Sequence, residues 1–186
     1  MVTTFALRFA TVSVVIVIVL SSRMRRRRGR GRRGSGVDVM RSFHWVRFAN
    51  LEPGPGERDF SFPAAPPAAV AIPGSNLEVV LKIEANPHDT LRTSVIDWGR
   101  IAGNAGELAI RNWRPGDRLV PVGHSQEQKV KSLFNEWRVP LWDRRNWPIL
   151  CLGDKVVWTR QFGAAAQFAP DSTTRTFLQI SERIRI

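Results

Sequence analysis

One helical pattern among many short strand-like runs constrains the fold of this chain more than any other feature of its sequence. Apolar side chains recur at Val130, Leu133, Phe134 and Trp137, the i, i+3, i+4, i+7 spacing of an amphipathic helix over about 126–138. Elsewhere, prolines and glycines divide the sequence into short runs. The sequence therefore predicts an α+β fold, with mostly short β-strands in a sandwich-like sheet arrangement and one main amphipathic helix.

Local signals mark both ends of the predicted helix. Ser125 and Gln128 have the S-x-x-Q spacing of a capping box, in which each side chain bonds a free backbone N–H of the first turn. Val139 precedes Pro140, and the residue before a proline disfavours the helical conformation. These signals predict a helix that begins soon after Ser125 and ends before Pro140.

Basic side chains flank the apolar stripe of this helix. On a helical wheel, Lys131 and Arg138 lie along one edge of the stripe and Lys129 lies along the other. From 107 to 186 the chain carries thirteen Lys and Arg against eight Asp and Glu. Such a surplus suits an anionic partner such as a phosphate backbone, although a solvated basic surface has the same composition.

The remaining apolar runs predict β-strands. In the clearest of them Leu77, Val79, Leu81 and Ile83 share one face. Gly153 and Asp154 form a hairpin signal between two short apolar runs. The predicted strands cover 41–49, 77–85, 93–99, 104–113, 149–153, 154–159 and 174–182.

An apolar run followed by an arginine cluster forms the first 35 residues. Eight arginines between Arg23 and Arg33 supply eight of the formal +12, which leaves +4 for the rest of the chain. The uncharged run at 9–22 is shorter than the roughly 20 residues that a spanning helix needs. We therefore expect 1–35 to be a low-complexity leader, either disordered or not part of the natural protein, and 36–186 to be the folded domain. A short membrane anchor at 9–22, with its arginines in the cytoplasm, is the alternative.

Two phosphate-binding patterns fall close to this cluster, and neither is complete. The G-x-G-x-x-G at 29–34 has arginines in its variable positions and no amphipathic helix after it. The segment at 34–40 lacks the second glycine and the closing serine of an S-G-G-x-D-S pyrophosphate loop. We expect no nucleotide site in this region.

Cysteine and histidine positions argue against disulfides and metal sites. Cys151 is the only cysteine and lies in an apolar run. His44, His88 and His124 are far apart and have no neighbours at metal-ligand spacing. We expect no metal.

A rigid turn at 114–118 is the first candidate for a binding site. Pro115 and Gly116 force the turn, and Asp117 can close it by accepting bonds from nearby amides. Arg114 and Arg118 are then held on either side of it, which suits phosphate recognition. A buried pair between Asp117 and an arginine, serving only the turn, is the alternative.

A second candidate lies at 140–148. Arg144 and Arg145 stand between Trp142 and Trp147, and interleaved guanidinium and indole groups can grip a backbone and stack on an unpaired base. The alternative is that most of the tryptophans belong to the core or cover it.

The order of these motifs resembles the C-terminal substrate domain of the tRNA(Ile)-lysidine synthase family. The resemblance is strongest over 107–186, and the segment "GVDVMRSFHWVRFA" extends it to Gly36. After Trp158 the chain has "TRQFGAAAQF" in place of the family's apolar turn with a further basic residue, so we assign no role to Arg160. The matching positions are Arg111, 115–118, 121–123, 129–134, 139–140, 144–145, 147–148 and 156–158.

The resemblance implies a function in tRNA modification. The family's enzyme uses ATP to adenylate the wobble cytidine of an isoleucine tRNA, and free lysine then displaces AMP. By resemblance, the C-terminal domain binds the tRNA at its acceptor stem and an N-terminal ATP-pyrophosphatase domain performs the chemistry. Because too few residues precede Gly36 for that domain, we expect no catalysis and no cofactor in this chain, with ATP and Mg acting only in the missing domain.

We therefore expect a tRNA-binding module in the cytoplasm, with isoleucine tRNA and a separate catalytic half as partners. A degenerate interaction domain, or one tethered to a membrane through 9–22, is the alternative; a third hypothesis is an active synthase that works in trans. Pro115, Gly116 and Asp117 structure the turn, and no catalytic residue is expected. The expected RNA contacts are Arg111, Arg114, Arg118, Lys129, Lys131, Arg138, Arg144 and Arg145.

Overall fold

The computed structural model describes residues 37–50, 59–86, 93–104 and 106–185. The predicted leader at 1–35 and its phosphate-binding patterns lie outside these residues. The chain divides into two units between Pro53 and Gly54, whereas the sequence places the boundary near Gly36. Each unit is described by itself.

The first unit contains an antiparallel hairpin of β1 (Val37–Ser42) and β2 (Trp45–Asn50). Ser42 pairs with Trp45, so the chain reverses over only two residues, and Phe43 takes a φ of 53°. Two-residue hairpin loops favour positive φ because their twist then matches that of the strands. The prediction of one continuous strand over 41–49 is therefore wrong.

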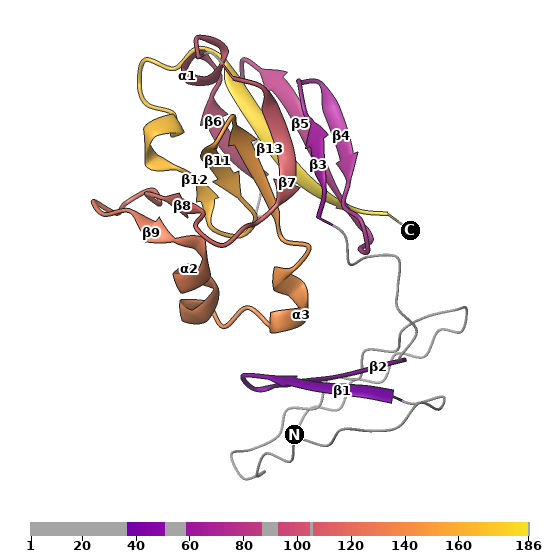
Figure 1. The fold of residues 1–186 in the computed structure, drawn as a ribbon. Coiled ribbons are helices and arrows are strands. Elements are labelled where there is room, and N and C mark those ends of the chain that lie inside the picture. Colours follow the sequence, from indigo (N-terminus) through magenta and orange to yellow (C-terminus); the bar gives the residue numbers. More distant parts are fainter. Residues whose placement is uncertain (1–36, 51–58, 87–92, 105, 186) are drawn as a thin grey trace. The chain divides into compact units, whose positions relative to one another are not determined.

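The second unit is built from two antiparallel sheets (Figure 1). One sheet has the order β4-β5-β13-β6, with the bounds β4 (Ala68–Ala71), β5 (Leu77–Glu84), β6 (Thr93–Asp97) and β13 (Phe177–Ile184). The other has the order β12-β11-β10-β7-β3, with the bounds β3 (Ser61–Pro63), β7 (Leu108–Asn112), β10 (Pro148–Leu152), β11 (Lys155–Thr159) and β12 (Gly163–Ala164).

Short elements complete the second unit. The two-residue strands β8 (Arg118–Leu119) and β9 (Gln128–Lys129) pair with each other. Figure 1 shows α1 at one end of the sheets and α2 and α3 at the other. The helices are α1 (Gly99–Ala102), α2 (Val130–Glu136), α3 (Leu141–Arg144) and the 3-10 helix η1 (Ala166–Phe168).

The two sheets share one hydrophobic core. Leu81 and Ile180 are cross-strand partners in β5 and β13, so their side chains lie on the same face, and both are buried. They belong to the same core cluster as Ile110, Ile149 and Val157 of the other sheet. The predicted α+β class, with short strands in a sandwich-like arrangement and one main helix, is confirmed.

The main helix begins later than the sequence predicts. Gln128 and Lys129 are extended and pair with β8, so the first helical residue of α2 is Val130. Lys129 is the N-cap residue and makes no side-chain capping bond, while the Gln128 amide lies 3.2 Å from the ring of His124. The capping box that includes Ser125 is therefore wrong, because strand pairing takes up the residues that would have formed the first turn.

A Schellman motif ends α2. The N–H of Val139 donates to the carbonyl of Phe134 at 2.8 Å, and the N–H of Arg138 donates to the carbonyl of Asn135 at 3.2 Å. Arg138 has a φ of 51°, in the left-handed region that glycine usually occupies at this position. Trp137 is thus the C-cap residue, and it is 55% exposed; the prediction that it extends the buried stripe is wrong because the helix ends before it.

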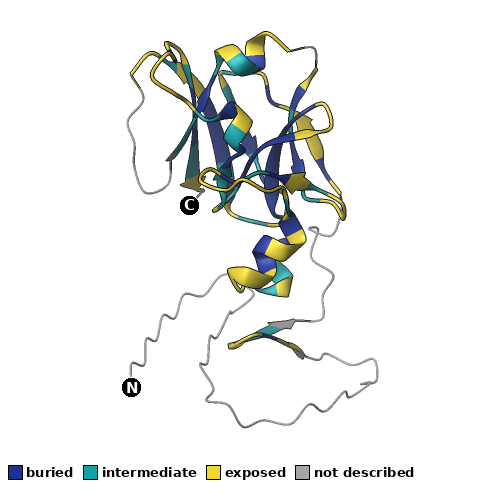
Figure 2. Ribbon diagram, turned by 90° about the vertical axis from the view of Figure 1, so that its left-hand side faces the viewer, coloured by how far each residue is buried: buried dark blue, intermediate teal, exposed yellow. Residues whose placement is uncertain are grey.

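Phe134 is the centre of an aromatic cluster that holds α2 against the second sheet. Its ring contacts Trp113 at a centroid distance of 5.0 Å and Trp147 at 5.3 Å, both edge to face, and Phe162 at 5.9 Å. Edge-to-face geometry places the positive ring edge against the negative ring face. Figure 2 shows buried and exposed residues alternating along the helices at this end of the unit.

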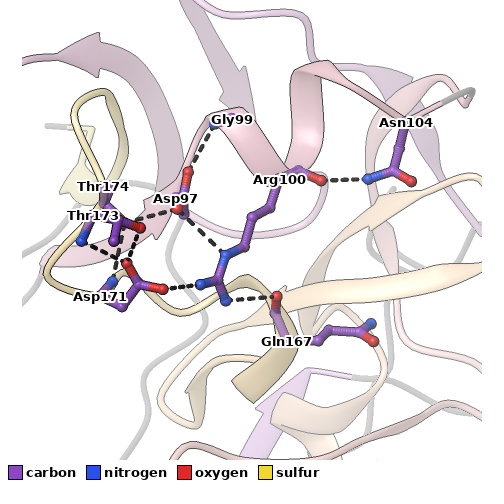
Figure 3. A network of polar contacts seen from close by, with 8 residues as sticks. All are labelled: Asp97, Gly99, Arg100, Asn104, Gln167, Asp171, Thr173 and Thr174. Carbon is purple, nitrogen blue, oxygen red and sulfur yellow. Dashed lines mark hydrogen bonds and ion pairs between the residues drawn. The ribbon is translucent and has the colours of Figure 1, made fainter.

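A polar network ties α1 to the loop before β13 (Figure 3). Arg100 pairs with Asp171 and lies 3.4 Å from the carboxylate of Asp97. The hydroxyl of Thr174 donates to Asp97 at 2.7 Å, and both side chains are buried. Thr173 donates to Asp171 through its amide and its hydroxyl. The loop is therefore fixed by its own hydroxyls as well as by the arginine.

Among the described residues, no helix is both long enough and apolar enough to span a membrane. The apolar run at 9–22 lies outside them.

We predict that Asp171→Asn changes stability in a pH-dependent way. Hydrogen bonds from Thr173, and to a smaller extent the charge of Arg100, lower the pKa of Asp171. Since the unfolded pKa is about 3.9, the carboxylate stabilises the fold above about pH 4, and this contribution is lost as the pH falls through the lowered folded pKa. Thermal unfolding should therefore show a Tm difference from the parent near pH 6 that shrinks towards pH 2. A difference that stays constant over this range would contradict the assignment.

Candidate functional site

A buried ion pair between Arg111 and Asp117 lies at the centre of the site. Two guanidinium nitrogens donate to the two carboxylate oxygens at 2.9 and 2.7 Å, and the side chains are only 10% and 9% exposed. Arg111 also donates to the carbonyl of Asn112 at 2.9 Å. The hydrogen bonds to Asp117 outweigh burial and raise the pKa of Arg111. Such bidentate geometry is the strongest form of this contact.

Register explains why Arg111 is buried. It is the cross-strand partner of Ile149 in β10, so its side chain shares a sheet face with Ile149 and, two residues along, with Cys151. Burial raises the pKa of the Cys151 thiol to about 11, which keeps it protonated and unreactive near neutral pH. An arginine on this apolar face needs a carboxylate above it, and Asp117 supplies one.

Asp117 also organises the turn and the start of α2. Its N–H donates to the carbonyl of Arg114 at 3.1 Å, and its carboxylate accepts the N–H of Arg114 at 2.6 Å. Gly116 has a φ of 105°, a conformation that side chains resist, which explains the glycine after Pro115. The carbonyl of Asp117 accepts the N–H of Val130, the first residue of α2. One residue therefore fixes β7, the turn and the helix relative to one another.

Arg118 and Lys129 stand beside each other on the β8–β9 ribbon. They are directly opposite in the register, so their side chains project from the same face, and both residues are exposed. Arg118 pairs with Glu127 at 3.1 Å, but the two side chains are 46% and 54% exposed, and such surface pairs contribute little.

The other exposed cations lie on the turn and around the two helices. Arg114 is exposed, and its bonds to Asp117 fix its backbone. Lys131 is exposed on α2, and Arg138 is exposed at its end. Arg145 is exposed and is the C-cap residue of α3.

Arg144 lies in the interior and joins α3 to the end of α2. Its Nε donates to the carbonyl of Val139 at 3.0 Å, and its Nη2 donates to the carbonyl of Phe134 at 3.3 Å. The guanidinium also lies over the Phe134 ring, at 5.4 Å from the centroid. Burial lowers the pKa of Arg144, and two of its donors are bonded to the carbonyls of Phe134 in α2 and Val139 just after it.

Trp147 is a core residue and is held in place by its indole N–H. It is 3% exposed, and Nε1 donates to the hydroxyl of Thr159 at 3.1 Å and the carbonyl of Arg160 at 3.2 Å. Arg160 lies over the Trp147 ring and pairs with Glu182 of β13 at 3.0 Å. Arg160 therefore links the two sheets, a role for which the sequence carried no signal.

A pocket of about 520 Å³ lies beside the turn. Its charged lining consists of three carboxylates, Asp117, Glu127 and Asp154, and two cations, Arg118 and Lys155. Because negative groups outnumber positive ones in its lining, the interior of this pocket does not favour a phosphate. Arg118, which also lines it, is itself exposed. Within the described part of the chain, no cluster of three His, Cys, Asp or Glu side chains is placed to hold a metal ion.

The eight arginines and lysines expected at an RNA surface therefore divide into two groups. Arg111 and Arg144 are buried and bonded within the fold. The other six are exposed on β8, β9, the turn, the helix α2 and the helix ends: Arg114, Arg118, Lys129, Lys131, Arg138 and Arg145.

Comparison with known proteins covers this same region. Residues 108–180 match the family model described as the TilS substrate C-terminal domain. A tRNA(Ile)-lysidine synthase of Solibacter usitatus (strain Ellin6076) is 38% identical over 155 residues, which cover 79% of this chain and 34% of that protein. Residues 108–180 belong to the family of TilS substrate C-terminal domains. The residues that match the family model include all eight of the expected contacts.

Two further comparisons concern a second curated relative and the fold of a solved structure. A tRNA(Ile)-lysidine synthase of Symbiobacterium thermophilum (strain DSM 24528 / JCM 14929 / IAM 14863 / T) is 32% identical over 157 residues, which cover 81% of this chain and 32% of that protein. A solved structure described as the crystal structure of a TilS C-terminal domain has the same fold, with a TM-score of 0.59 at 20% identity; the match covers 68% of this chain and 98% of that one. The chain spans about a third of the length of these two curated relatives.

We predict that Arg111→Ala destabilises this lysidine synthase domain by about 3 to 5 kcal/mol, because it leaves the Asp117 carboxylate buried without its partner. The Arg111→Ala/Asp117→Ala double variant should lose clearly less than the sum of the two single losses. Denaturant unfolding of Arg111→Ala, Asp117→Ala and the double variant measures the free energy of unfolding of each. Glu127→Ala, which breaks the exposed pair with Arg118, is the control and should change stability by about 0.5 kcal/mol or less. Additive losses at Arg111 and Asp117 would show that the pair is not coupled.

Proposed function

We propose that this chain binds tRNA as the substrate-binding part of a tRNA(Ile)-lysidine synthase. The observation that carries the proposal is the direct opposition of Arg118 and Lys129 beside the turn that fixes Arg114. Like charges directly opposite each other in a β-ribbon destabilise it, and the exposed pair between Arg118 and Glu127 offsets little of this repulsion. A phosphate between the two side chains would remove that repulsion.

The fold supports a division of labour among the basic residues. Arg111 and Arg144 act as positioning residues, because their donors are already bonded to Asp117 and to helix carbonyls. The six exposed cations contact phosphate and sugar groups directly. Since such contacts read position and shape, specificity comes mainly from fit to a double-helical stem.

The names of the relatives supply the substrate class. The curated relatives are called tRNA(Ile)-lysidine synthases, so the RNA that we propose is an isoleucine tRNA, and the cytoplasm is where the chain would meet it. ATP and Mg would act in the part of the synthase that this chain does not match. We also propose that the β1–β2 hairpin belongs to this binding part, as the boundary expected near Gly36 implies.

We predict that Arg114→Ala and Arg118→Ala each weaken tRNA binding and leave stability nearly unchanged. The turn survives because its bonds use the backbone of Arg114 and not its side chain. Each loss should lower the slope of log affinity against log salt by about 0.7 to 0.9, as one phosphate contact does. Filter binding or anisotropy with an isoleucine tRNA, at several salt concentrations, measures this slope.

Arg183→Ala is the matched control, because Arg183 is an exposed arginine in β13 of the other sheet and is not among the proposed contacts. Its salt slope should equal that of the parent chain. If the parent binds no tRNA at low salt, or binds with an affinity that salt does not change, the proposed function is wrong. That result would favour the alternative of a degenerate domain that binds another partner.

We also predict opposite effects of Arg138→Gly on stability and on binding. Glycine accepts the left-handed conformation at this position without strain, so the Tm should be unchanged or higher. Affinity for tRNA should fall, with a lower salt slope, because one cation is lost. A lower Tm with unchanged affinity would show that Arg138 serves the fold instead.

A further inference from the structure

An exposed indole stands at the end of α2, among the proposed phosphate contacts. Trp137 is 55% exposed, whereas Trp147 and Trp158 are 3% and 2% exposed. Other apolar side chains, such as Leu141 and Ile184, are as exposed, so exposure alone assigns no role. Trp137 differs from them in being an indole next to the proposed phosphate contact Arg138.

Trp137 is held by contacts that leave much of it open. Its ring meets Phe162 edge to face, at a centroid distance of 5.9 Å and an interplanar angle of 68°. Phe162 is itself packed against the core. The backbone N–H of Trp137 donates to the carbonyl of Leu133 at 2.9 Å, at the helix end that Arg138 closes. The indole is thus presented on an anchored backbone.

Backbone strain occurs next to this indole. Arg138 adopts the left-handed conformation without being glycine, which is unfavourable for a side chain with a Cβ atom. Strained residues of this kind cluster at functional sites. Lys131 lies in the first turn of α2, and Arg138 follows Trp137 directly after the helix ends. Both cations are exposed.

We propose that Trp137 is a stacking platform for the base of an unpaired nucleotide in the tRNA that this domain binds. The inference rests on the proposed function and adds a base contact to its phosphate contacts. An indole presents a flat π surface to a base, and cations beside it suit the phosphates on either side of that base. The base must be unpaired, because a base inside a duplex is already stacked on its neighbours.

The test compares two RNAs, three variants at Trp137 and one control variant, all in the full chain. The RNAs are an isoleucine tRNA, which has unpaired nucleotides, and a blunt duplex with the sequence of its acceptor stem. Trp137→Ala should bind the tRNA roughly 5- to 100-fold more weakly, the range for loss of one stacked base, and bind the duplex within about twofold of the parent. The salt slope should not change, because an indole carries no charge.

Trp137→Phe and Trp137→Leu separate stacking from general apolar contact. Phenylalanine keeps a π face and should retain most of the affinity, whereas leucine should lose about as much as alanine. Ile184→Ala is the matched control, since Ile184 is 57% exposed in the other sheet, and it should bind both RNAs like the parent. Thermal unfolding of each variant shows whether the fold is intact.

The outcomes distinguish this inference from the proposed function. If the parent binds neither RNA, the proposed function fails and the stacking site fails with it. If the parent binds tRNA with the expected salt dependence but Trp137→Ala binds equally well, only the stacking site is wrong. Equal losses on both RNAs, or leucine behaving like phenylalanine, would also overturn it and point to a structural or protein-binding role.

Discussion

The buried contact between Arg111 and Asp117 is the interaction on which the rest of the site depends. Moving two charges out of water is costly, and only close bidentate geometry with further hydrogen bonds offsets the cost. Both conditions are met, since the pair has two bonds of 2.7 and 2.9 Å and each partner makes additional backbone bonds. The same carboxylate closes the turn, and the carbonyl of Asp117 meets the first N–H of α2. A neutral residue at either position would leave the other charge buried, and at position 117 it would also remove the carboxylate that closes the turn.

Arginine has two physical roles in this domain. Arg144 and Arg160, like Arg111, have bonded guanidinium groups that hold elements together. Arg144 joins α3 to the end of α2, and Arg160 joins one sheet to the other. The planar guanidinium suits these roles because it can bond carbonyls or carboxylates while it covers an aromatic ring. The arginines of the proposed RNA surface are instead exposed, and the backbone of Arg114 is fixed by its bonds to Asp117. A binding surface of this kind needs both classes, because long cationic side chains position a polyanion only if their Cα atoms do not move.

Local patterns in the sequence were sufficient for much of the fold. The alternation of apolar residues from Leu77 predicts β5, and Gly153 and Asp154 predict the hairpin of β10 and β11. The sequence could not predict the start of α2, because pairing between Arg118 and Lys129 overrides the local capping signal. Such a pairing joins two segments that meet only when the chain between them folds back.

The candidate site was less predictable than the fold. The spacing of the sequence allows a pair between Asp117 and an arginine but does not say which arginine, since the choice of Arg111 depends on the register of β7 against β10. Periodicity assigns Trp137 to the buried stripe, and only the left-handed Arg138 ends the helix before it. In both cases the deciding factor is a backbone conformation or a register that side-chain periodicity does not encode.

The most direct test of this account is a hydrogen-exchange footprint of the chain with and without an isoleucine tRNA. If the surface organised by Asp117 binds the RNA, amides in 114–118 and 129–138 gain protection when tRNA is added, and amides in β5 and β13 exchange as before. Protection confined to the β4–β5–β13–β6 sheet, with tRNA demonstrably bound, would contradict the account.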